Sequence, residues 1–125
     1  MSLIPPPPPP PSGYPDVWAA LAALSFNKHY LHISFHYPPP MSELEAAHRI
    51  QPIINTADDW LKYAGNCWIV WSSQKPQEWF DKFAAVDALK PCSIFIVKID
   101  LSPSPDNRAG QFPKWVWEWI GRTRT

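Results

Sequence analysis

Residues 30–37 read Tyr-Leu-His-Ile-Ser-Phe-His-Tyr, and this stretch decides the fold. Successive side chains of a β-strand point to opposite faces, so the apolar side chains of Leu31, Ile33 and Phe35 share one face. The opposite face carries polar and aromatic side chains, namely Tyr30, His32, Ser34 and His36. The alternation predicts a half-buried strand with one face toward a core and an open face that bears two histidines.

A helix is predicted directly after this strand. Ser42 stands three residues before Glu45, the spacing of a capping box, in which each side chain satisfies a backbone N–H at the helix start. Apolar residues then follow at helical spacing: Leu44, Ala47, Ile50 and Ile54. Pro52 lies inside this stripe, and because proline removes a backbone hydrogen bond we expect a kink or break there.

The next segments predict two strands, a second helix and a last strand. Residues 58–63 and 67–72 are joined by a tight turn at Gly65 and Asn66, residue types that tolerate positive φ. Residues 67–71 are apolar on both faces, which is typical of a central strand. The second helix begins near Pro76, and its apolar side is formed by Trp79, Phe80, Phe83 and Val86. Residues 92–101 complete a β-α-β-β-α-β series.

The C-terminal residues 112–121 are rich in tryptophan. Pro113 and Gly121 are placed as in a short helix, whereas the alternation of Trp residues is that of a strand; the punctuation favours the helix. Each of the three tryptophan side chains would bury roughly 150–250 Å² of surface, and so small a core cannot accommodate all three. At least one of them is therefore expected to cover the open sheet or a second subunit. The segment therefore predicts a homodimer, with an interface set of Tyr30, His32, Trp115, Trp117 and Trp119.

Length and composition limit the organisation of the chain. Its 125 residues suffice for one domain, predicted at 29–125, after a proline-rich and largely disordered segment at 1–28 that includes the seven prolines of residues 5–11. Eleven basic and eleven acidic residues cancel, so the net charge does not support nucleic acid as a partner. No apolar stretch is long enough for a membrane helix. The spacing of Cys67 and Cys92 fits neither a zinc site nor a disulfide framework, so we expect free thiols and a cytoplasmic protein.

The order of the elements, the strand at residues 33–38 and the segment at residues 59–70 resemble the small CRISPR-associated ferredoxin-like endonucleases and their VapD and SinR-like relatives. The resemblance covers about residues 29–101. It implies an α+β fold, a ferredoxin-like two-layer sandwich with an antiparallel sheet, here followed by the Trp-rich C-terminal extension. It also implies a homodimer and, for several members, cleavage of RNA or DNA with a divalent metal.

The chain departs from this family at the residue that would carry the chemistry. The family has an acidic residue at the end of the first strand, where this sequence has His36, and Mg²⁺ prefers oxygen ligands. For a nuclease the catalytic set would be His36, Ser34 and Asp100, all near strand ends. His32 and His36 are about 13 Å apart on a strand, too far to bind one metal ion.

The residues of the open face allow two further interpretations. His32 and Ser34 form one His-x-Ser unit of a two-histidine phosphoesterase, but no second unit follows, because the last histidine is His48. Tyr30 with Trp68 or Trp71 could stack RNA bases. The sequence favours a dimeric, non-catalytic binding or interaction protein with no cofactor and no metal site. The alternative is an endonuclease that uses Mg²⁺ or Mn²⁺ to cleave RNA.

Overall fold

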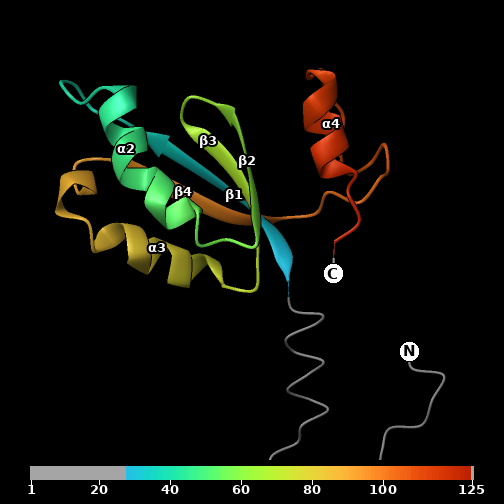
Figure 1. Ribbon diagram of the computed structural model, residues 1–125, viewed down its shortest axis with the longest axis horizontal. Helices are drawn as coiled ribbons and strands as arrows, with labels where there is room; N and C mark the ends of the chain where they lie inside the picture. Colours follow the sequence, from blue (N-terminus) through green and yellow to red (C-terminus); the bar gives the residue numbers. More distant parts are fainter. Residues whose placement is uncertain (1–27, 125) are drawn as a thin grey trace, which may run out of the picture.

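The computed structural model describes residues 28–124, which form an α+β fold (Figure 1). The elements are β1 (His29–His36), α2 (Glu43–Ile54), β2 (Asp59–Ala64), β3 (Cys67–Ser72), α3 (Pro76–Ala84), the 3₁₀ turn η1 (Asp87–Leu89), β4 (Ser93–Ile99) and α4 (Lys114–Ile120). The predicted β-α-β-β-α-β series is confirmed, and the C-terminal segment is a helix. Apart from Lys28, the proline-rich segment predicted at 1–28 lies outside the described residues.

The four strands form one antiparallel sheet in the order β2-β3-β1-β4. β1 is bonded on both sides, and Ile33 stands between Trp68 of β3 and Ile96 of β4. β2 and β4 are the two edges. Because β1 separates the strand that begins at Cys67 from the strand that follows Cys92, the two sulfurs stay apart, and both thiols are free as predicted.

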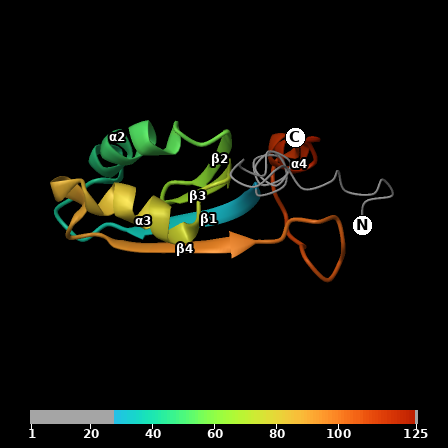
Figure 2. The ribbon, with the colours of Figure 1, turned by 90° about the horizontal axis from the view of Figure 1, so that it is seen from below.

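The helices α2 and α3 lie side by side on one face of the sheet (Figure 2). The core between them and the sheet contains the predicted apolar face of β1 (Leu31, Ile33 and Phe35). From the neighbouring elements it receives Ala46, Ile50, Ile54, Trp68, Val70, Trp79, Phe83 and Leu89. The one buried polar side chain among the described residues, Ser72, accepts a hydrogen bond from the indole N–H of Trp79 at 3.3 Å. The alternation of β1 therefore identified the core face correctly.

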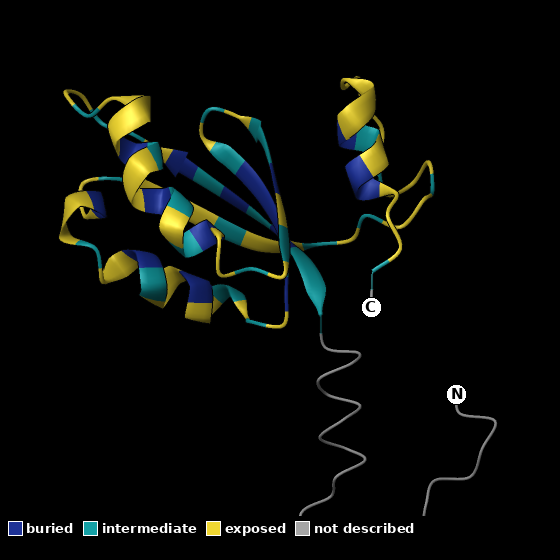
Figure 3. Cartoon of the chain, viewed as in Figure 1, coloured by how far each residue is buried: buried dark blue, intermediate teal, exposed yellow. Residues whose placement is uncertain are grey.

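The helices turn different residues inward than the apolar stripes suggested (Figure 3). Ser42 caps α2 as predicted, at 3.1 Å from the amide of Glu45. Leu44, however, is 82% exposed, and Ala46 is buried in its place. Both stripes contain more apolar positions than one helix face can bury, and the docking angle decides which are covered.

Contrary to the prediction from the sequence, Pro52 does not break the helix, and α2 runs without interruption from Glu43 to Ile54. Pro52 lies on the exposed side of the helix. There, water can bond the carbonyl that lacks an amide partner, so the helix continues at little cost.

The second face of the sheet is covered only in part. α4 packs over it at one end, where a second cluster joins Leu61 and Ile69 of the sheet to Val116, Trp119 and Ile120. The three tryptophans of this segment differ in burial: Trp119 is buried, Trp117 is half-buried and Trp115 is 53% exposed. The face that the sequence left open is therefore half closed by the protein's own C-terminal helix.

Two phenylalanines of α3 test this assignment of the core. Phe83 is fully buried and Phe80 is 42% exposed. We expect Phe83→Ala to lower the free energy of unfolding by about 3–5 kcal/mol through lost burial and a cavity. Phe80→Ala, the same change one turn away, should cost less than about 1 kcal/mol. Urea unfolding followed by circular dichroism measures both, and equal losses would contradict the helix orientation.

Candidate functional site

The structure separates the three residues predicted as a catalytic set. Ser34 and His36 lie two residues apart on the same face of β1. Asp100 follows β4 at the opposite end of the sheet, because His36 is paired with Ser93, the first residue of β4, and Tyr30 with Ile99, the last. Six residues of strand, about 20 Å, therefore lie between His36 and Asp100. Within one chain these side chains do not meet.

Asp100 has a local role that the sequence did not show. Its carboxylate accepts hydrogen bonds from the backbone N–H of Ser102 at 2.9 Å and from the Ser102 hydroxyl at 2.5 Å. These two bonds lower the pKa of Asp100. The ionised side chain thus holds the turn that takes the chain out of β4, as Asp commonly does in turns.

His32 is bonded within the sheet rather than free for a partner. Its Nε2 atom is hydrogen-bonded to the hydroxyl of Tyr63. Burial lowers the pKa of His32 and raises the pKa of Tyr63 to about 12. At neutral pH the Tyr63 phenol therefore stays protonated, and its hydroxyl donates a hydrogen bond to the uncharged imidazole of His32.

Arg124 ties the C-terminus to the sheet. Its guanidinium donates to Asp59 Oδ2 at 2.9 Å, to the Tyr30 hydroxyl at 2.9 Å and to the Trp119 carbonyl at 2.7 Å. It also lies 4.1 Å from the centre of the Trp119 ring, and its side chain is 7% exposed. One side chain thereby connects β1, β2 and α4 and fixes the position of the Tyr30 ring.

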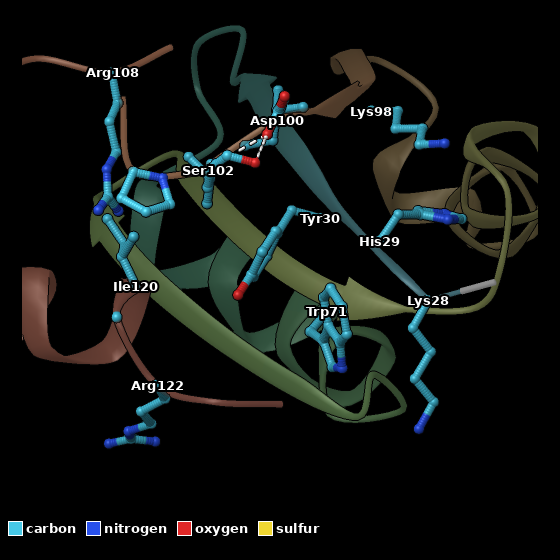
Figure 4. Close-up of a pocket in the computed structure, with 14 residues that line it drawn as sticks. Lys28, His29, Tyr30, Trp71, Lys98, Asp100, Ser102, Arg108, Ile120 and Arg122 are labelled. Atoms are coloured by element: carbon cyan, nitrogen blue, oxygen red, sulfur yellow. Dashed lines mark hydrogen bonds between the residues drawn. The ribbon is translucent and has the colours of Figure 1, made fainter. Parts of the chain in front are cut away.

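A pocket of about 560 Å³ opens beside this tie (Figure 4). It lies where β1 begins and β3 and β4 end, and the loop after β4 and the turn after α4 close its other side. Tyr30 and Trp71 lie in its centre, with ring centres 4.7 Å apart. Trp68 cannot take part, because it is fully buried on the other face of the sheet. Trp71 is therefore the tryptophan that could form a base-stacking surface together with Tyr30.

Basic side chains surround these two rings. Four lining residues are basic (Lys28, Lys98, Arg108 and Arg122), and one, Asp100, is acidic. Two of the four have an acidic neighbour: Lys28 lies 3.7 Å from Asp58, and Arg122 lies 3.9 Å from Asp59, which Arg124 contacts more closely. Among residues 28–124, neither Lys98 nor Arg108 lies within 4.0 Å of a carboxylate. The pocket is thus a local positive region in a chain of zero net charge.

Of the residues that line this pocket, sequence reasoning had singled out only Tyr30, Trp71 and Asp100, and had not placed them in one site. A signal was present, because residues 107–125 contain four basic residues and one acidic residue. The sequence could not show that basic residues of this segment lie near Tyr30, because the segment and Tyr30 are far apart along the chain; Arg124, for example, bonds a residue 94 positions away.

Comparison with models of known protein families, with curated proteins and with solved structures finds no match to this chain. Within residues 28–124, no group of three or more His, Cys, Asp and Glu side chains is arranged to hold a metal ion. None of the helices in that part of the chain has the length and apolarity needed to cross a lipid bilayer.

The Arg124 tie can be tested by stability. Arg124→Ala removes charge-assisted hydrogen bonds and should lower the free energy of unfolding by about 1–3 kcal/mol. Arg122→Ala is the matched control, and because that side chain is 62% exposed it should cost less than about 1 kcal/mol. Urea unfolding monitored by tryptophan fluorescence measures the difference. An equal effect of the two substitutions would show that the tie does not hold α4.

The His32–Tyr63 pair predicts a pH dependence. Because the pKa of His32 is lowered in the folded protein, the unfolded chain binds more protons below about pH 6.5, and stability falls as the pH falls through that range. His32→Gln should flatten the dependence between about pH 5 and pH 7. His48→Gln, on the exposed side of α2, is the control. Urea midpoints at each pH give the comparison, and an unchanged slope in His32→Gln would refute it.

Proposed function

We propose that this chain is a non-catalytic binding protein of ferredoxin-like fold that acts as a homodimer joined along β4. The β-α-β-β-α-β order, the strand order β2-β3-β1-β4 and the two helices on one face support the ferredoxin-like assignment. The separation of Ser34 and His36 from Asp100 supports a role in binding rather than in catalysis. The reducing cytoplasm is the compartment that suits the free thiols of Cys67 and Cys92.

The edge strand β4 carries the proposal. No residue of its seven is fully buried, and it contains the apolar run Ile94 to Val97. Phe95 is 62% exposed and Val97 is 36% exposed, on the face away from α2 and α3. Proteins normally protect a strand edge with charges, proline or a covering element. Among the described residues, β4 has a single charged side chain, Lys98, and no further strand beside it.

A second copy of the chain is the occupant that fits this edge. In an antiparallel β4–β4 pair centred on Ile96, each Phe95 would lie opposite Val97 of the partner subunit, so the contact is self-complementary. Each Lys98 would lie opposite an Ile94, and the two ammonium groups would stay about 14 Å apart along the strands. The hollow of about 240 Å³ between the start of α3 and β4, lined by Phe80 and Phe95 among others, would border the same joint.

The endonuclease alternative gains no support from this arrangement. In the β4–β4 pair, His36 of one subunit and Asp100 of the other would be separated by two strand spacings, about 10 Å between their Cα atoms. The Asp100 carboxylate, however, is already engaged in its own turn, where it accepts hydrogen bonds from the backbone N–H and the hydroxyl of Ser102. Cleavage of RNA with Mg²⁺ or Mn²⁺ stays a prediction from the resemblance.

Replacement of Phe95 tests the dimer. We expect the protein to have twice the 14.3 kDa chain mass in analytical ultracentrifugation. Phe95→Lys should be monomeric, because each added charge would be placed against Val97 of the partner subunit and the two like charges would lie diagonally across the joint, about 7–8 Å apart. Leu44→Lys adds the same charge at an exposed position of α2 and should remain dimeric. A monomeric wild-type protein at about 50 μM, a concentration well above typical dimer dissociation constants, would overturn the proposal.

A further inference from the structure

The pocket at the end of the sheet combines two features that select one class of ligand. Its rim has a surplus of positive charge from Lys98, Arg108 and Arg122, and its centre has the aromatic rings of Tyr30 and Trp71. Arginine and lysine side chains favour phosphate oxygens, and half-buried indole rings stack on planar bases. Either feature alone is common on protein surfaces, and their convergence in one concave site is not.

The surroundings hold this pocket in shape before any ligand arrives. Arg124 donates a hydrogen bond to the Tyr30 hydroxyl at 2.9 Å, which restrains the Tyr30 ring in the pocket. Arg108 lies with its guanidinium 5.9 Å from the centre of the Trp117 ring, which directs it from the loop toward α4. Asp100 is already engaged with Ser102, so its carboxylate has a partner on the rim. A preformed site loses less entropy on binding than a mobile one.

The size of the pocket agrees with a small anionic ligand. Its volume of about 560 Å³ lies within the usual range of sites for small molecules and cofactors, roughly 300–1,000 Å³. The basic side chains come from two separate segments of the chain, the loop after β4 (Arg108) and the turn after α4 (Arg122), and both segments line the pocket that contains Tyr30 and Trp71.

We propose that this pocket binds a nucleoside phosphate, with the phosphate between Arg108 and Arg122 and the base stacked on Trp71. A free nucleotide and a unit of single-stranded RNA present the same chemistry, and the experiment below separates them. The pocket belongs to one chain and lies apart from residues 94–97, so this inference does not depend on the proposed dimer.

Binding of adenosine monophosphate and of a fluorescein-labelled single-stranded decamer RNA is measured at 50 mM and 200 mM salt with the full-length protein. The first is followed by calorimetry and the second by fluorescence anisotropy. We expect Arg108→Glu/Arg122→Glu to weaken binding by about ten-fold or more at low salt. For the decamer, the slope of log affinity against log salt should fall by roughly one to one and a half, since each lost phosphate contact removes about 0.7.

The control carries the same change in net charge at other places. Lys90→Glu/Lys114→Glu reverses two exposed lysines, one directly after the 3₁₀ turn η1 and one at the start of α4, and should bind as the wild type does. Trp71→Leu keeps an apolar side chain but removes the stacking surface, and should weaken both ligands by about five-fold or more. Inorganic phosphate should bind Trp71→Leu as well as it binds the wild type. Circular dichroism melting confirms that each variant is folded.

Each outcome decides. Tighter binding of the decamer than of the mononucleotide assigns the site to single-stranded RNA, and equal binding assigns it to the free nucleotide. Absence of binding by the wild type at 50 mM salt overturns the proposal. Equal losses in the Arg108/Arg122 and Lys90/Lys114 variants would show non-specific charge attraction and also overturn it. Should Trp71→Leu fail to fold, the two charge-reversal variants still decide. The monomeric Phe95→Lys variant should bind normally, so failure of the dimer proposal and failure of this one are distinguishable.

Discussion

The sheet of this protein has apolar side chains on both faces, and the chain covers the two faces unequally. Burial of apolar surface contributes about 25 cal/mol per Å², so each uncovered face is a large loss of stabilisation. α2 and α3, with 12 and 9 residues, close the first face over a continuous core. α4 has 7 residues and reaches only the end of the second face, over Leu61 and Ile69. The exposed strip on β4 and the pocket beside α4 both follow from this shortage.

A helix as short as α4 does not persist in water by its own backbone hydrogen bonds, because helix nucleation is unfavourable. Its position therefore depends on tertiary contacts, the burial of Val116 and Trp119 and the hydrogen bonds of Arg124. The same guanidinium holds Tyr30, so the docking of the C-terminus and the shape of the pocket are one event. The hydrogen bonds of Arg124 therefore support both the fold of the C-terminal segment and the candidate binding site.

Charge is distributed unevenly although the total is zero. The first turns of α2 and α3 carry acidic side chains, which suit the positive end of a helix dipole. Two basic residues of the C-terminal region, Arg108 and Arg122, line the pocket together with Lys28 and Lys98. A ligand experiences the field near its binding site and not the sum over the chain, so the balance of eleven against eleven residues did not exclude an anionic ligand.

The sequence by itself determined the series of elements and the core face of β1, because the period of two in Leu31, Ile33 and Phe35 needs no tertiary information. For residues 112–121 the local signals Pro113 and Gly121 favoured a helix over the strand suggested by the alternating tryptophans, and the helix is what the structure contains. The tertiary structure decided what depends on direction and docking. Strand pairing placed Asp100 at the far end from His36, and helix packing exposed Leu44 and Phe80. Only the folded chain could bring Arg124 to Tyr30, since no local rule joins residues 94 positions apart.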